Sequence, residues 1–191
     1  MHLAPVAAAE TRRAAGAQRR QADDAARAGN GGGAADGGMM EVAVGSGAGL
    51  VLMHRKGTPE TMQKDPHYED VVNEVRSFLG ERIRAVLGAG GERDRMVVDP
   101  GIGFGKRLEH NLGLLRGLPT LRTLGCPVLV GVSRKRMFEE LLGRPVGERL
   151  GGSLGAAAFA RVHGASIFRV HDVKETCDLL RVMDMLTAER S

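Results

Sequence analysis

The chain has 191 residues, of which 42% are hydrophobic and 26% charged, a balance typical of a globular domain and not of a disordered or fibrous chain. Its formal net charge of +4 favours anionic ligands, but aromatic residues make up only 3%, which argues against a nucleic-acid surface built on base stacking. The sequence shows no apolar run of about eighteen residues and no secretory signal pattern, so we expect a cytoplasmic protein that does not bind membranes.

The first part of the chain differs in composition from the rest. Residues 7–38 consist mainly of Ala, Arg, Gly, Gln and Asp and contain almost no large apolar side chains. Because such a segment has little to bury, we expect residues 1–38 to be atypical and poorly ordered, and residues 39–191 to form the folded domain.

From Met39 onward, short apolar runs alternate with helical patterns. Buried strands are predicted at 47–54, 95–100, 126–133 and 165–173, and helices at 68–87, 109–122, from 134 onward, 154–164 and 174–189. Repeated βα units predict a parallel sheet, either doubly wound or closed as a (β/α)8 barrel. Every predicted strand ends in polar residues, which favours the barrel, because its active sites lie at that end of the strands.

The stretch "MVVDPGIGFGK" (residues 96–106) first suggests a phosphate-binding loop. A Walker-type loop needs one more residue between its glycines and a Ser or Thr after the lysine, where this chain has Arg107. The glycines also fail the dinucleotide-binding spacing. Asp99 is then the candidate functional residue, since a carboxylate at the end of a buried strand needs cationic or N–H partners, and it can bind an amidine-like ligand edge with two hydrogen bonds. The alternative is a plain Asp-Pro turn.

Two further strand ends carry cations. In "GVSRKR" (residues 131–136), Ser133 is a predicted helix N-cap and the three cations that follow are predicted in the first helical turn, where they would oppose the helix dipole unless a ligand met them. In "FRVHDV", Arg169 and His171 should project to one side of a strand and suit a pyrophosphate or another polyanion. The alternatives are a solvated basic turn for the first and an ion pair with Asp99 for the second. His54 reads as structural.

Taken in order, "LVLMH" with "GTPETMQ", "DPGIGFGK", "GVSRKR" and "RVHDV" resemble dihydropteroate synthase over residues 39–187. The resemblance implies a (β/α)8 barrel that joins 6-hydroxymethyl-7,8-dihydropterin pyrophosphate to p-aminobenzoate, releases pyrophosphate and forms 7,8-dihydropteroate for folate biosynthesis. It also implies Mg²⁺ as cofactor and a homodimer formed through the last helices.

The resemblance assigns roles to the matching residues. Asp99 would bind the amino-pyrimidinone edge of the pterin, and Lys135 its carbonyl and ring. Gly131 belongs to the substrate-binding residues, and Ser133 would help hold the p-aminobenzoate carboxylate. Arg169 and His171 would hold the pyrophosphate, and together with Lys135 they would be the catalytic residues. Met53 and Phe104 would line the pterin pocket.

The N-terminal part departs from the family pattern. Glu10 stands where a pterin-binding aspartate is expected, and Asn30 lies one position away from the expected asparagine. The first two βα units, the usual metal-ligating asparagine and a Thr-Arg loop have no counterpart, so we expect an incomplete barrel of about six units and no metal ligand in this chain.

Two origins fit this departure: a wrong start or shifted reading frame upstream of a normal synthase, or a truncated relative. Two other functions stay open beside the synthase: a non-catalytic fragment that binds pterin or anions, and a pterin-dependent methyltransferase domain. The cations of "GVSRKR" and "RVHDV" argue against the methyltransferase.

Overall fold

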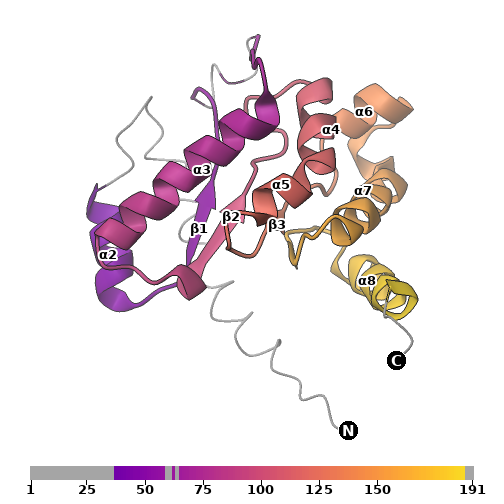
Figure 1. The fold of residues 1–191 in the computed structure, drawn as a ribbon. Helices are drawn as coiled ribbons and strands as arrows, with labels where there is room; N and C mark the ends of the chain where they lie inside the picture. Colours follow the sequence, from indigo (N-terminus) through magenta and orange to yellow (C-terminus); the bar gives the residue numbers. More distant parts are fainter. Residues whose placement is uncertain (1–36, 59–61, 63–64, 188–191) are drawn as a thin grey trace, which may run out of the picture.

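The computed structural model of the protein describes residues 37–58, 62 and 65–187 (Figure 1). Glu10 and Asn30 lie outside these residues, and so does most of the predicted atypical segment. The predicted boundary between residues 38 and 39 falls inside a described helix, α2 (Gly37–Ser46), which the sequence pattern did not indicate. None of the helices in the described ranges is long and apolar enough to cross a membrane.

Four short strands lie where the apolar runs predicted them: β1 (Leu50–Met53), β2 (Met96–Asp99), β3 (Leu129–Val130) and β4 (Ile167–Phe168). β1 pairs with β2 in parallel, with Met53 opposite Asp99, and β3 pairs with β4 in parallel. A parallel bridge between Val98 and Val128 connects the two pairs. The strands therefore follow one another in chain order, as expected for successive βα units.

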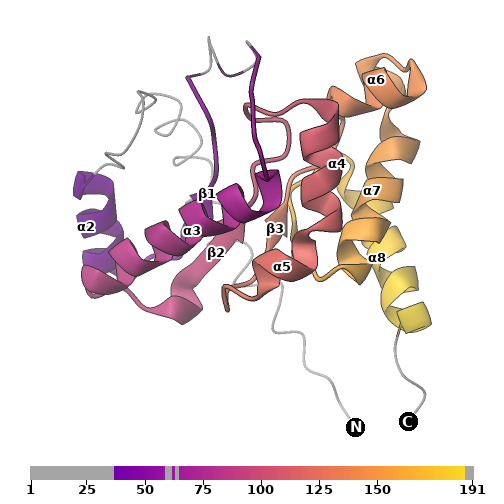
Figure 2. The same cartoon turned by 45° about the horizontal axis from the view of Figure 1, so that its top comes forward.

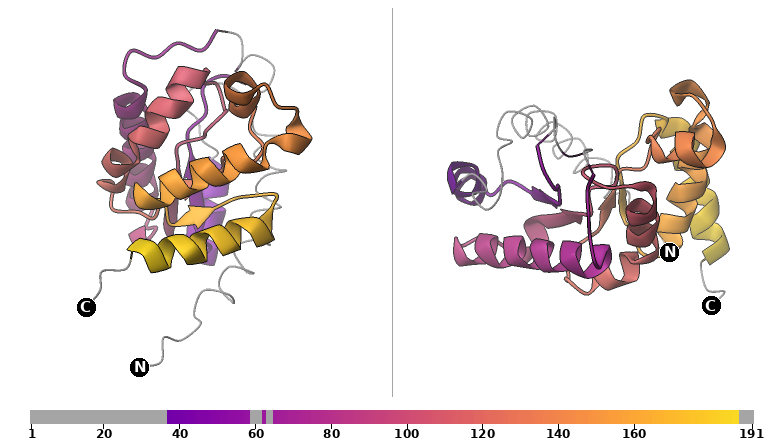
Figure 3. Two further views of the ribbon diagram at one scale, coloured as in Figure 1. Left: turned by 90° about the vertical axis from the view of Figure 1, so that its right-hand side faces the viewer. Right: turned by 90° about the horizontal axis from the view of Figure 1, so that it is seen from above.

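The helices that follow the strands are α3 (Val71–Gly88), α4 (Leu108–Arg116), α5 (Leu118–Arg122), α6 (Met137–Leu142), α7 (Leu150–Val162) and α8 (Val173–Thr187), with single 3-10 turns at Arg93–Arg95 and Val146–Glu148. α3 runs alongside β1 and β2 (Figure 1), and α4 lies between α3 and α7 (Figure 2). α7 and α8 pack side by side (Figure 3).

Two predicted helices differ from the structure. The helix predicted at 109–122 is divided, because Gly117 ends α4 and Pro119, which has no N–H to donate, stands in the first turn of α5. A side chain at Gly117 would meet Val72 of α3 at 2.6 Å, so the break also lets α3 approach closely. The helix predicted from residue 134 begins only at Met137.

The core lies between the strands and the helices. α3 contributes four buried residues at helical spacing, and α7 contributes the small residues Ala157 and Ala160, which allow close packing as predicted. Burying a side chain such as Leu79 stabilises the fold by about 2 kcal/mol. The core therefore packs the helices against the strands, and the polar residues at the carboxyl ends of the strands lie outside it. The buried apolar residues of the strands and α3 are Val75, Leu79, Ile83, Val86, Met96, Val98, Val128, Leu129 and Val130.

Candidate functional site

The carboxyl ends of the four parallel strands bring together residues that are far apart in the sequence. β1 is followed by His54, β2 ends at Asp99, β3 is followed by the segment 131–135, and β4 by Arg169. The backbone N–H of His54 donates to the carbonyl of Asp99 at 3.0 Å, so the first two strand ends are joined directly. Because the strands are parallel and adjacent, their ends form one face.

Asp99 is the most deeply buried acidic residue of this face, with 1% of its surface exposed. Its Oδ1 accepts a hydrogen bond of 2.7 Å from the N–H of Gly101, and its Oδ2 lies 3.5 Å from Nη2 of Arg169. Burial raises the pKa of Asp99, while the Gly101 N–H, Arg169 and Lys135 oppose that shift. The ion pair between Asp99 and Arg169, which the sequence offers as the alternative to a polyanion site, is therefore present. Since half of the Arg169 side chain is exposed, it can also reach a ligand.

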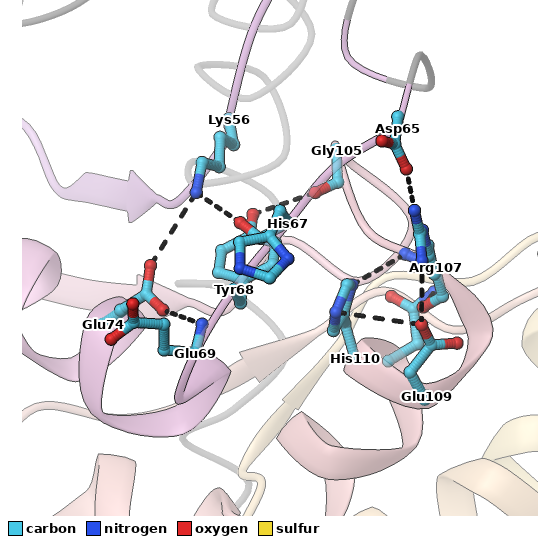
Figure 4. Close-up of polar contacts among 11 residues, drawn as sticks. Lys56, Asp65, His67, Tyr68, Glu69, Glu74, Gly105, Arg107, Glu109 and His110 are labelled. Atoms are coloured by element: carbon cyan, nitrogen blue, oxygen red, sulfur yellow. Dashed lines mark hydrogen bonds and ion pairs between the residues drawn. The ribbon is translucent and has the colours of Figure 1, made fainter.

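The loop that follows Asp99 is pressed against the end of β1. Gly101, Gly103 and Gly105 all have positive φ angles. A Cβ at Gly101 would lie 1.9 Å from the carbonyl oxygen of His54, and one at Gly105 would lie 2.2 Å from that of Lys56. The glycines thus serve as turn residues for close backbone approach, and not as a phosphate cradle. The Tyr68 hydroxyl donates to the Gly105 carbonyl at 2.9 Å (Figure 4).

Lys106 ends the glycine-rich stretch and its side chain folds back onto this loop, a role that the motif spacing did not predict. It is 3% exposed. Its Nζ lies 3.0 Å from each of three groups: the carbonyl oxygens of Gly101 and Phe104, and Nδ1 of His54. The signal available in the sequence was a lysine that closes a glycine-rich turn directly after a strand.

Burial lowers the pKa of Lys106 to about 7, and Asp99 acts in the opposite direction. Burial also lowers the pKa of His54 to about 3, with Lys106 adding to the shift. A charged Lys106 donates to all three acceptors. A neutral one can donate to the two carbonyls and accept from His54 when that ring carries its proton on Nδ1. The loop keeps all three contacts in either state. His54 is thus buried and held by groups of the protein, which supports its interpretation as a structural residue.

Lys135 lies on the other side of the loop. Its Nζ is 4.3 Å from the centre of the Phe104 ring, a cation–π contact. Gly103 makes room for it, because a Cβ there would lie 3.2 Å from Cδ of Lys135. Burial lowers the pKa of Lys135, and Arg169 lowers it further. The structure thus groups the predicted residues Asp99, Phe104, Lys135 and Arg169. Met53 lies beside them, half-buried opposite Asp99 in the β1–β2 register.

Ser133 and His171 also meet. The Ser133 hydroxyl accepts from the backbone N–H of His171 at 3.1 Å and lies 3.0 Å from its Nδ1. Gly131 stands two residues earlier, and a Cβ there would lie 3.1 Å from Nη2 of Arg169, so its missing side chain lets Arg169 cross the end of β3.

The prediction that Ser133 caps a helix is wrong, and so is the placement of three cations in its first turn. Arg134 adopts a left-handed conformation, with a φ angle of 56°, which breaks the chain away from helical geometry. Its N–H donates to Ser153 Oγ, and its guanidinium makes two hydrogen bonds to Asp172. α6 starts after Arg136. Because it is only six residues long, it offers no extended dipole to an anion.

A cavity of about 520 Å³ opens beside the cluster formed by Asp99, Phe104, Lys135 and Arg169. Gly103, Lys106 and Lys135 line it, together with Arg107 and Arg136. Asp99 is not among the residues that line the cavity, so the cavity lies next to Asp99 and does not reach its carboxylate. Within the described ranges, no three His, Cys, Asp or Glu residues gather so as to hold a metal ion.

Residues 26–171 match the family described as "Pterin binding enzyme". The chain belongs to this family. The dihydropteroate synthase of Escherichia coli K12 is 45% identical over 147 residues, a match that covers 77% of this chain and 52% of the relative. That of Neisseria meningitidis serogroup B is 47% identical over 142 residues, covering 72% and 50%. The chain thus spans about half the length of the curated relatives it matches.

Solved structures of the family share the fold. A dihydropteroate synthase from Stenotrophomonas maltophilia with imidazole in its active site aligns with a TM-score of 0.78 at 42% identity, over 82% of this chain and 59% of that one. The enzyme from Xanthomonas albilineans in complex with 7,8-dihydropteroate aligns with a TM-score of 0.74 at 43% identity, over 80% and 56%. The enzyme from Thermus thermophilus in complex with 4-aminobenzoate aligns with a TM-score of 0.74 at 45% identity, over 78% and 58%.

Proposed function

We propose that this chain carries the pterin-binding face of a dihydropteroate synthase, a transferase that condenses 6-hydroxymethyl-7,8-dihydropterin pyrophosphate with p-aminobenzoate in folate biosynthesis. The observation that carries the proposal is the buried Asp99 carboxylate, which faces the half-exposed Arg169 guanidinium at the carboxyl ends of parallel strands. A buried carboxylate that is costly to the fold suits a ligand edge with two N–H donors.

The other residues of the face follow from this placement. Lys135, held over Phe104, would contact the pterin carbonyl, and Met53 and Phe104 would line the ring. Arg169 and His171 would hold the pyrophosphate. Ser133 already binds His171 twice, so we assign it to orienting that ring and, only by releasing one contact, to the p-aminobenzoate carboxylate.

In the proposed reaction, the bond from the pterin methylene to the pyrophosphate oxygen breaks and the amine nitrogen of p-aminobenzoate forms a bond to the same carbon, losing one proton. The protein's contribution is to orient the two substrates and to neutralise the charge of the departing pyrophosphate. The exposed part of Arg169 supplies a fixed positive charge for that purpose.

Mg²⁺ does not fit the described residues as a protein-held ion. The one acidic group of the cluster, Asp99, is buried and already bound to Gly101 and Arg169, and no metal-holding group of three acidic, His or Cys residues occurs in the described ranges. We therefore assign no step to a metal.

We also propose the overall architecture and the assembly of the protein. The parallel strands in chain order support a (β/α)8 barrel, of which the described residues form four consecutive strands. Exposed apolar residues on α7 and α8 support a homodimer. The two cysteines are both free, which suits the reducing cytoplasm.

The test is to incubate the purified chain with both substrates and magnesium and to measure 7,8-dihydropteroate, beside calorimetric titration with the pterin pyrophosphate alone. Product above background supports the synthase. Binding without product supports the second candidate, a non-catalytic protein that binds pterin or anions. No binding contradicts both.

A further inference from the structure

Lys106 is a buried lysine that the proposed chemistry does not use. All three positions around its Nζ are occupied by groups of the protein, so it has no N–H left for a ligand. Any effect it has on substrates must pass through the groups that it holds.

Those groups lead to both sides of the site. The carbonyl of Gly101 accepts from Lys106, and the N–H of the same residue donates to Asp99. The carbonyl of Phe104 also accepts from Lys106, and the ring of the same residue lies under Lys135. Lys106 is therefore connected to the Asp99 carboxylate through one residue, Gly101, and to the Lys135 side chain through another, Phe104.

The third contact anchors this arrangement to the sheet. His54 follows β1 directly, is 6% exposed, and packs edge-on against Phe78 of α3 with ring centres 5.0 Å apart. Its backbone N–H binds the carbonyl of Asp99. These contacts fix the position of the loop relative to the β1–β2 pair. A loop held only by its own turns would not be fixed in this way.

We propose that Lys106 is a positioning residue that sets the distance between the Asp99 carboxylate and the Lys135 ammonium by holding the carbonyls of Gly101 and Phe104 against His54. The inference rests on the proposed function for its effect on substrate, but its effect on the loop can be measured without any ligand. A ligand that spans Asp99 and Lys135 would then lose affinity when Lys106 is replaced, although it never contacts Lys106.

Lys56 offers a matched control. Its Nζ lies 4.3 Å from the Tyr68 ring and donates to the His67 carbonyl at 2.5 Å (Figure 4). It thus contacts the same aromatic ring that Lys106 approaches at 6.0 Å, but from an exposed position and without contact to the carbonyls of Gly101 and Phe104.

The first experiment compares amide hydrogen exchange in the full chain, Lys106→Met and Lys56→Met, without ligand. We expect the amides of Gly101 and Phe104, which bind Asp99 and Gly101 respectively, to exchange at least about tenfold faster in Lys106→Met only. Unchanged exchange would overturn the inference. If Lys106→Met does not fold, Lys106→Gln, which keeps one donor group, takes its place.

The second experiment titrates the same proteins with 6-hydroxymethyl-7,8-dihydropterin pyrophosphate. We expect affinity to fall at least about tenfold in Lys106→Met and to stay within about twofold in Lys56→Met.

In a double-mutant cycle, the losses of affinity from Lys106→Met and Phe104→Leu should overlap and not add, because both substitutions act through Phe104. Wild-type affinity retained in Lys106→Met, or fully additive losses, would reduce Lys106 to a structural role. If the wild type itself does not bind, the proposed function fails, and the exchange data still decide the inference.

Discussion

At the scale of single residues, Asp99 shows a conflict between folding and ligand binding. Burial raises its pKa, so the charged carboxylate costs the folded state free energy that the Gly101 N–H and Arg169 offset only in part. A group whose folded pKa lies above its unfolded one loses stability as pH rises through its titration range. A side chain that served only the fold would not need this charge.

Asp99→Asn should therefore weaken ligand binding without weakening the fold. We expect its unfolding free energy at pH 7, measured with urea, to equal or exceed that of the wild type, because the amide keeps an acceptor for Gly101 and carries no buried charge. Asp178→Asn, at an exposed position, is the control. A loss of more than about 2 kcal/mol would show that Asp99 is mainly structural.

His54 predicts a specific pH dependence of stability. Its pKa is about 3 in the folded protein against 6.5 ordinarily, because it is buried beside Lys106. Between these values the unfolded chain binds a proton that the folded protein excludes, so the unfolding free energy should fall as pH falls, by at most about 1.4 kcal/mol per unit. In urea titrations at several pH values, His54→Asn should flatten this slope and the exposed control His67→Asn should not. Equal slopes would contradict the burial of a neutral His54.

The sequence predicted the residues of the cluster better than their contacts. Asp99 and Arg169 were placed at strand ends, and their ion pair was weighed as an alternative, because the end of a parallel strand restricts where a side chain can lie. The role of Lys106 could not be predicted, since it depends on a turn that folds the lysine back on two carbonyls of its own loop. Motif spacing does not encode such a contact.

At the scale of elements, the connection from β3 to α6 depends on α7. Ser153 of α7 accepts from the N–H of Arg134 at 2.9 Å and donates to the carbonyl of Arg149 at 2.7 Å. The Arg149 side chain in turn donates to the carbonyl of Arg134. These contacts hold Arg134 in its left-handed conformation, directly before Lys135.

Ser153→Ala should leave the Arg134 N–H without a partner in a half-buried position. We expect a loss of about 1–3 kcal/mol in unfolding free energy, and a lower melting temperature by calorimetry. Ser77→Ala on the exposed face of α3 is the matched control and should change little. If both variants melt alike, Ser153 does not hold this connection.

Strand positions were predictable because each strand is a short apolar run bounded by glycine or polar residues. Helix ends were less so. The break at Gly117 follows from the local Gly-Leu-Pro sequence, and the missing side chain of Gly117 also leaves room for Val72. The late start of α6, in contrast, depends on a tertiary contact with Ser153, which lies 19 residues beyond its partner Arg134 in the chain.

At the scale of the whole molecule, α7 and α8 present apolar side chains to solvent. Val182 is 57% and Met185 80% exposed, and Phe159 and Val162 of α7 are exposed as well. We expect sedimentation velocity to show a dimer at micromolar concentration and a folded monomer for the double variant Val182→Glu/Met185→Glu. A wild-type monomer under these conditions would contradict the proposed homodimer.

We propose above that Asp99 and its neighbours Phe104, Lys135 and Arg169 bind a pterin. The most direct test of this proposal is calorimetric titration of the full chain and of Asp99→Asn with 6-hydroxymethyl-7,8-dihydropterin pyrophosphate. We expect saturable one-site binding to the wild type and a loss of at least about tenfold in affinity in Asp99→Asn, because the substitution removes a charge-assisted hydrogen bond. Absence of binding by the folded wild type, or equal affinity of the two proteins, would contradict the proposal.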